Sequence, residues 1–256
     1  RLTSLKNCTN VHLCAPKGGL TRGKGRTGKT VAGRGEAGKM QFDMRELALL
    51  ERYKLINSTI TPRPVAWVTT VRADGLVNAA PYSFFNACGI EPPLVVLGLL
   101  KDFRTGALKD TATNIAANGE FVVNLVNEAD VETMNLSSVD APRDVSEVDY
   151  AGIATTPSTL VAPPRIATSP VSFECRRVEA LDIGALQTVV IGEVLMMHVA
   201  DDFITNPEKL YLDTPAMKLV GRTHGAGWYA RTSDQFSVDR PRFDAERAER
   251  TRGGGQ

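Results

Sequence analysis

From Met40 onward the chain is a succession of short apolar segments that are rich in β-branched residues and separated by proline or glycine. Segments of about four to eight such residues between turn signals are typical of β-strands. After the first of them, Ala73-Asp74-Gly75 predicts a hairpin turn, because glycine adopts positive φ without strain. The sequence predicts strands at residues 65–71, 76–81, 94–100, 121–126, 171–181 and 188–199.

Helical patterns are fewer than strand patterns. They cover residues 44–52, 105–118 and 128–136, and Asn118-Gly119 predicts the end of the second helix. The proline-rich stretch 141–170 is expected to cross the surface. Because helices do not alternate regularly with strands, the sequence predicts a mainly β fold, an antiparallel barrel that is closed or nearly closed and has inserted α-helices. The pattern does not favour a doubly wound parallel sheet.

The net charge of +1 hides an uneven distribution of charge. Residues 1–39 contain nine Lys and Arg against one acid, together with eight glycines. Such a segment has too little apolar surface to offset the entropy of ordering, so we expect it to be disordered. We interpret residues 1–39 as an extension that is not native to the protein, residues 40–239 as the folded domain, and residues 240–256 as a flexible tail.

The basic segment contains a nucleotide-binding motif, since residues 23–30 match the phosphate-binding loop G-x-x-x-x-G-K-[ST]. This loop binds phosphate only between a buried strand and a helix N-terminus, and neither flanking stretch has such a pattern. We favour a chance match in a glycine- and lysine-rich tract and keep a P-loop nucleotide-binding protein as a competing hypothesis. A nucleic-acid partner is not favoured, because the segment has no aromatic residue for base stacking.

Several classes of protein are excluded by features that the sequence lacks. No apolar run reaches about 18 residues, so no membrane span is expected. The four cysteines form no C-x-x-C pair and only three histidines occur, so neither a metal site nor a disulfide-stapled secreted domain is expected. This cysteine usage is typical of a cytoplasmic protein. No protein-based catalytic motif occurs, so if the protein is an enzyme, a bound cofactor is expected to supply the chemistry.

Three segments have side chains suited to a cofactor with a ring and a phosphate. Arg63 followed by Thr69-Thr70 offers a cation and hydroxyls along a strand. Residues 78–86 place aromatic residues beside small polar ones, which suits a flat ring. Lys109 and Thr111, at the start of an expected helix, favour an anion. Each residue also has an ordinary explanation as a strand, core or surface residue, and only their combined order favours a site.

The order of six segments carries a family resemblance: residues 62–68, 78–86, 91–93, 109–115, 120–125 and 190–194. Together they resemble the flavin reductase-like family of FMN-binding split barrels, which includes flavoredoxins and the reductase components of two-component monooxygenases. The resemblance extends from about Tyr53 to Tyr229. It implies a Greek-key split β-barrel with inserted α-helices that binds FMN, or FAD as the alternative, near the interface of a homodimer.

The resemblance also implies roles for individual residues. Lys109 and Thr111, together with Arg63, would hold the flavin phosphate. The closing segment of these domains often returns to the flavin, which makes Tyr229 a cofactor-binding candidate and His224 a candidate catalytic residue. The residues implied to contact the flavin ring and its ribityl chain are Thr69, Thr70, Ser83, Phe84, Phe85 and Asn86.

The function that this resemblance implies is that of a flavin reductase, an oxidoreductase in which NAD(P)H as co-substrate passes a hydride to the flavin N5. The reduced flavin would then serve a partner monooxygenase or another electron acceptor. The alternative is an FMN-binding electron carrier of the flavoredoxin type, without efficient NAD(P)H turnover. A homodimer is expected, with no nucleic-acid or membrane partner.

Overall fold

The computed structural model describes residues 32–34 and 38–243 of the chain. The phosphate-loop motif at residues 23–30 lies outside the described residues, as do most of the basic extension and the end of the C-terminal tail. The expectations for these parts therefore stay predictions.

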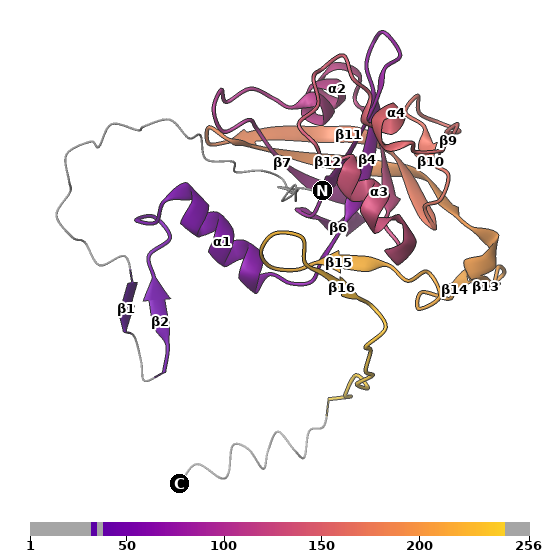
Figure 1. The fold of residues 1–256 in the computed structure, drawn as a ribbon. Coiled ribbons are helices and arrows are strands. Elements are labelled where there is room, and N and C mark those ends of the chain that lie inside the picture. Colours follow the sequence, from indigo (N-terminus) through magenta and orange to yellow (C-terminus); the bar gives the residue numbers. More distant parts are fainter. Residues whose placement is uncertain (1–31, 35–37, 244–256) are drawn as a thin grey trace, which may run out of the picture.

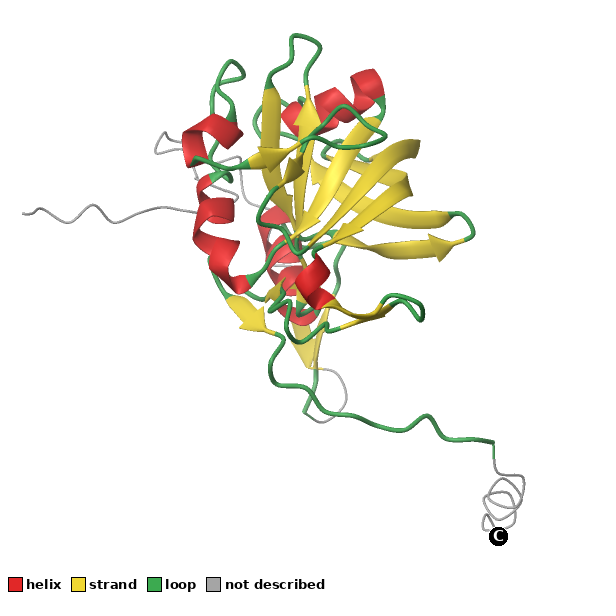
Figure 2. Cartoon of the chain, turned by 90° about the vertical axis from the view of Figure 1, so that its right-hand side faces the viewer, coloured by secondary structure: helices red, strands yellow, loops and turns green. Residues whose placement is uncertain are grey.

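The largest element is a seven-stranded sheet in which every pair of neighbours is antiparallel. Its long central hairpin crosses the molecule in Figure 1, and Figure 2 shows that the strands fan out and curve. In spatial order the strands are β5 (Val77–Tyr82), β4 (Ala66–Val71), β8 (Glu120–Leu125), β11 (Val171–Ile183), β12 (Gln187–Val199), β7 (Pro93–Leu100) and β6 (Phe85–Ile90).

The remaining elements surround this sheet. The helices are α1 (Leu49–Thr59), α2 (Asp110–Asn118), α3 (Val131–Leu136) and α4 (Glu147–Ala151), with short 3-10 turns at Glu128–Asp130 and Asp201–Phe203. A three-stranded sheet joins β16 (Tyr229–Arg231), β15 (Val220–Arg222) and β3 (Arg63–Pro64). Three strand pairs are β9 (Thr155–Thr156) with β10 (Arg165–Ile166), β13 (Ile204–Asn206) with β14 (Tyr211–Leu212), and β1 (Ala32–Arg34) with β2 (Met40–Phe42).

The large sheet curves around one hydrophobic core. Val68 of β4 and Leu97 of β7, from strands near opposite edges, belong to the same buried cluster, and Ile115 of α2 joins them. Phe121 of β8 packs so closely against β12 that a Cβ atom at Gly192 would lie 2.4 Å from its ring. The edge strands β5 and β6 are not paired with each other in the described structure. The mainly β fold is thus confirmed, but the sheet is curved rather than closed.

The opposite face of β4 carries a second core, because successive side chains of a strand point to opposite faces. Trp67 of β4 packs there with Met134 of α3, Val148 of α4 and Val220 of β15. The Trp67 Nε1 donates a hydrogen bond of 2.9 Å to the Ser137 hydroxyl, which satisfies the buried indole N–H. The two cores fix α2 on one side of β4 and α3 and α4 on the other.

Two helices begin later than the sequence pattern predicts. The first was expected at residues 44–52, but the Asp43 carboxylate accepts the Arg45 N–H and holds a turn there, so α1 starts at Leu49. The second was expected from Thr105, but the Asp102 carboxylate accepts the N–H groups of the two following loop residues, 104 and 105. Gly106 then has a φ of +72°, which breaks the helical path, and α2 starts at Asp110.

Two further segments differ from the sequence-based expectation. Ala32–Arg34 belongs to the segment expected to be disordered, yet it pairs with Met40–Phe42 as an antiparallel hairpin. The stretch 141–170, expected to cross the surface, contains helix α4 and the pair β9–β10. Proline density predicts interrupted structure but does not reveal that buried apolar residues such as Val148 and Ile166 anchor the short elements between the prolines.

Candidate functional site

Predicted site residues from distant parts of the chain meet where β5 ends and the chain runs through Ser83 into β6. On one side lies a group of buried polar residues between β4, β5, α2 and α4, none more than 7% exposed. We call this group the buried polar cluster. It consists of Thr70, Asn78, Thr111, Asn114 and Glu147.

Hydrogen bonds join the members of the buried polar cluster across the elements. The Asn114 amide of α2 donates to the Thr70 hydroxyl of β4 at 3.0 Å. The Asn78 amide accepts from the Thr111 hydroxyl at 2.9 Å and donates to Glu147 Oε2 at 3.2 Å. Two predicted residues, Thr70 and Thr111, are therefore brought together, but their hydroxyls bond to protein groups and are buried.

Burial controls protonation in and beside the cluster. It raises the pKa of Glu147, because desolvation disfavours the carboxylate. It also raises the pKa of Tyr82 to about 12, although a hydrogen bond with Thr111 opposes the shift. Tyr82 thus stays a neutral phenol that joins the end of β5 to the start of α2.

The start of α2 presents the cation that the sequence predicts as a phosphate ligand. Lys109 is the residue before the first helical turn, and its Nζ lies 2.8 Å from Asp140 Oδ1. Both side chains are at least 40% exposed, so the ion pair is worth about 0–1 kcal/mol and exchanges easily for another anion. The free N–H groups of a first helical turn add positive potential beside Lys109.

Arg63 lies on the other side of Ser83 and joins three segments. Its guanidinium donates to the carbonyl oxygens of Asn57 and Ile60 at the end of α1 and to Thr223 O at 3.0 Å, while its Nε lies 3.3 Å from Ser83 Oγ. Only 6% of the residue is exposed. Burial, together with nearby Arg222, lowers the pKa of Arg63. The side chain is therefore committed to protein acceptors.

The closing segment reaches the same place through β15, whose Arg222 pairs with Arg63 of β3. The Arg222 guanidinium lies 4.9 Å from the centre of the Tyr229 ring, in a cation–π contact. The exposed His224 ring stacks on Trp228, with ring centres 5.8 Å apart. The structure thus brings Tyr229 to the Arg63 side of the site and places His224 on an exposed loop.

The predicted residue Thr69 faces the other side of β4 from Thr70. Its side chain is fully buried, and its hydroxyl donates to Pro164 O at 2.5 Å. Pro164 ends a loop, residues 157–164, that is also held by the Glu174 carboxylate. As a result the two consecutive threonines do not form one surface.

Two aromatic residues and an asparagine follow Ser83 at the junction between β5 and β6. Phe84 is partly exposed and lies 6.3 Å, ring to ring, from Tyr53 of α1. Phe85 packs against the core enclosed by the large sheet. Asn86 is exposed, and its side-chain oxygen accepts the N–H of Ala87. The stretch therefore offers one partly exposed ring and polar backbone beside it.

Several residues of this site were not predicted. Asn78 stood in a recognised segment, but nothing in its spacing showed that it would link Thr111 to Glu147. Glu147 comes from the proline-rich stretch 141–170, where no periodic pattern marks an inward-facing carboxylate. Arg222 belongs to the closing segment, and its contact with Tyr229 depends on the pairing of β15 with β16.

Among residues 32–34 and 38–243 no group of three or more His, Cys, Asp or Glu side chains is placed to hold a metal ion. In the same part of the chain, no helix has both the length and the apolar character needed to cross a membrane.

Comparison with known proteins shows which sequences and folds this chain resembles. The sequence pattern described as "Flavin reductase like domain" matches residues 58–217. An uncharacterized protein of Deinococcus radiodurans is 42% identical over 204 residues, which cover 78% of this chain and 88% of that protein. Two crystal structures are similar over most of their length.

The first is 2-nitrobenzoate 2-nitroreductase NbaA of Pseudomonas fluorescens, which is 35% identical and has a TM-score of 0.72 over 79% of this chain and 97% of that one. The second is nitrilotriacetate monooxygenase component B of Bacillus cereus, which is 30% identical, also with a TM-score of 0.72, over 77% of this chain and 98% of that one. The resemblance carried by the six sequence segments is confirmed. The chain belongs to the flavin reductase-like domain family.

Proposed function

We propose that this protein binds FMN at the junction around Tyr82 and Ser83 and reduces it with NAD(P)H. The observation that carries the proposal is the convergence of β3, β5, α2 and β15 on this junction, with a cation at one end and a partly exposed aromatic ring at the other. The similarity to a nitroreductase and to a monooxygenase component supports an oxidoreductase. The curved sheet would then be the split barrel of this family.

The residues fit an FMN molecule in the chemistry of their donors. Lys109 and the first turn of α2 offer a cation and N–H groups to the phosphate. Phe84 and the backbone beside it offer an aromatic surface and polar groups to the ring. A flavin held there would supply redox chemistry, taking a hydride from NAD(P)H and passing the electrons to an acceptor.

The protein groups would position the cofactor rather than transfer protons. The buried polar cluster holds α2 against β5, which fixes Lys109 relative to the aromatic stretch. Arg63 holds Ser83 and the closing segment together, so that the other side of the junction has a defined shape. Such a prearranged site lowers the entropy lost on binding.

Replacing Lys109 with Ala is expected to weaken FMN binding about ten- to a hundredfold, because a charge-assisted hydrogen bond to the phosphate is worth about 1.5–3 kcal/mol. Riboflavin has no phosphate, so its affinity should stay unchanged. Quenching of flavin fluorescence by the purified protein measures both affinities. Equal losses for FMN and riboflavin would contradict a phosphate role, and failure of the wild-type protein to bind either flavin would refute the proposed function.

Turnover separates the reductase from the alternative carrier. The proposal predicts steady oxidation of NADH or NADPH when free flavin is supplied in excess, followed as a loss of nicotinamide absorbance. An FMN-binding electron carrier would bind flavin with the same Lys109 dependence but oxidise little NAD(P)H. K109A then provides the internal control, because its reductase rate with riboflavin should match that of the wild type.

We also propose that two copies of the chain associate. Large apolar side chains are exposed at the end of α1, where Ile60 directly follows the helix and is 59% exposed, and on the central hairpin, where Val178 and Met197 are 56% and 53% exposed. Exposed apolar area of this kind is typical of association surfaces. Light scattering after size-exclusion chromatography is expected to give twice the chain mass, and Val178→Lys should shift the equilibrium toward the monomer. A monomer at all accessible concentrations would contradict this proposal.

A further inference from the structure

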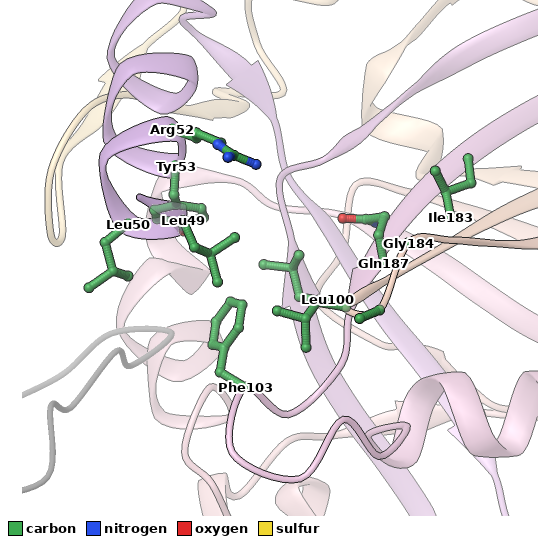
Figure 3. A pocket seen from close by; sticks show the side chains of 11 residues that line it. Leu49, Leu50, Arg52, Tyr53, Leu100, Phe103, Ile183, Gly184 and Gln187 are labelled. Atoms are coloured by element: carbon green, nitrogen blue, oxygen red, sulfur yellow. The ribbon is translucent and has the colours of Figure 1, made fainter. Parts of the chain in front are cut away.

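A cavity of about 310 Å³ opens between α1, the end of β7 and the turn that joins β11 to β12 (Figure 3). This volume is at the small end of the range of ligand sites, about 300–1,000 Å³. Its walls are mostly apolar: Leu49 and Leu50 come from α1, Leu100 is the last residue of β7, and Phe103 lies in the segment that follows. A small ring or short aliphatic group fits such a lining.

One cation stands at this apolar cavity. The Arg52 guanidinium is fixed by two hydrogen bonds of 2.9 Å, from Nε to Leu47 O and from Nη2 to Arg45 O. Its Nη1 has no hydrogen bond, and its charge no ion pair, within the part of the chain that the structure describes. Asp182 directly precedes the hairpin residues that line the cavity, but its carboxylate is paired with Lys101 rather than with Arg52. A fixed guanidinium with unused donors suits a carboxylate.

The wall opposite α1 adds a polar group. Gln187 uses its side-chain nitrogen for the carbonyl oxygens of Leu99 and Thr188, so its amide oxygen is left to face the cavity. Figure 3 shows this oxygen on the hairpin side and the Arg52 guanidinium on the helix side. A planar ligand with an anionic end would thus meet apolar walls along its ring and the Arg52 cation at its charged end, which would point away from the Gln187 oxygen because both are hydrogen-bond acceptors.

The cavity is next to the stretch proposed to hold the flavin ring. Tyr53 lines the cavity and lies 6.3 Å, ring to ring, from Phe84. A Cβ atom at Gly98 would lie 2.9 Å from Phe84 Cβ and 3.1 Å from the Gln187 amide nitrogen. Phe84 and the cavity wall therefore pack on the same point of β7.

We propose that this cavity is a subsite that binds a small aromatic carboxylate, with its ring between Leu49 and Phe103 and its carboxylate on Arg52. The subsite's place beside a flavin rests on the proposed function, but binding of the carboxylate itself does not. The proposal assigns to α1 a role in ligand selection, because α1 supplies both the cation and part of the apolar wall.

Benzoate is the probe, titrated calorimetrically into the full-length chain without added flavin, and benzyl alcohol is its neutral analogue. Arg52→Gln is expected to weaken benzoate binding about tenfold, the size of one charge-assisted hydrogen bond, and to leave benzyl alcohol unchanged. Lys54→Gln, an exposed residue of the same helix outside the cavity, should change neither affinity. Ala185→Phe, which adds a ring to the lining, should weaken both ligands.

Three results would overturn the proposal. The wild-type protein could show no heat of benzoate binding, R52Q and K54Q could lose benzoate affinity equally, or A185F could leave the affinities for both ligands unchanged. In the FMN-loaded protein, benzoate is expected to change the flavin absorption spectrum with the same midpoint as in the calorimetric titration. Benzoate binding with no spectral change would overturn the placement beside the flavin. If the protein binds benzoate but no FMN, the proposed function fails while the carboxylate subsite stands.

Discussion

Replacing Glu174 with Gln is expected to lower the free energy of unfolding by about 3 kcal/mol, as measured by urea denaturation at pH 7. Glu174 is completely buried. Its two carboxylate oxygens accept the N–H groups of Thr159 at 2.7 Å and Leu160 at 2.6 Å, and the His198 Nε2 lies 2.6 Å from Oε1. A glutamine would turn its NH₂ group toward one of these donors, so one buried N–H would lose its acceptor.

The pH dependence of stability should change in the same variant. Burial raises the pKa of Glu174, but the Thr159 and Leu160 N–H groups and His198 lower it more, so that it lies below the ordinary value of 4.5. A carboxyl with a lowered pKa in the folded state stabilises the protein above its unfolded pKa and loses this effect as the pH falls through the folded pKa. Wild-type protein should therefore lose stability from pH 4.5 downward more steeply than E174Q.

The matched control is Glu179→Gln, an exposed carboxylate on the same strand. It is expected to change the free energy of unfolding by less than about 0.5 kcal/mol. Hydrogen exchange adds a local measurement, because the amides of Thr159 and Leu160 should exchange faster in E174Q. Stability of E174Q equal to that of E179Q, or an unchanged acid profile, would contradict the structural role assigned to Glu174.

The sequence predicts most of the sheet because strand patterns are local. The segments at residues 65–71, 94–100 and 121–126 match β4, β7 and β8 within a residue or two. The turn at Gly75, with a φ of +88°, and the end of α2 at Gly119, with a φ of +76°, follow from glycine alone. The local pattern does not show which strands are neighbours in the sheet. The order β5-β4-β8-β11-β12-β7-β6 and the unpaired edges therefore could not be predicted from it.

The site was predicted as a set of residue types, and the structure shows which of them face each other. Thr69 and Thr70 are consecutive, so they must lie on opposite faces of β4, and only Thr70 joins the buried polar cluster. Lys109 was expected early in a helix over residues 105–118, whereas in the structure it immediately precedes α2, which starts at Asp110. Glu147 and Arg52 were missed, because a carboxylate in a loop-rich stretch and a cation on a surface helix have no distinguishing pattern.

Replacing Arg63 with Met is expected to lower the free energy of unfolding by about 3 kcal/mol, because several carbonyl oxygens lose their donor at once. Two of these carbonyl oxygens belong to Asn57, in the last turn of α1, and to Ile60, directly after the helix. The third belongs to Thr223 of the closing segment. Arg45→Met, at a side chain that is 88% exposed, is the matched control and should cost less than about 0.5 kcal/mol.

The same variant separates two roles for Arg63, a direct phosphate contact and a joint between segments. Since its guanidinium bonds to protein acceptors, we expect R63M to weaken FMN and riboflavin by the same factor, in contrast to K109A. Arg63→Lys keeps the charge but not the planar group of several N–H donors. It should therefore lose nearly as much stability, and nearly as much affinity for both flavins, as R63M. The opposite result would be that R63M folds and loses more affinity for FMN than for riboflavin, while R63K recovers the affinity for FMN. Arg63 would then contact the phosphate, and linking the segments would not be its main role.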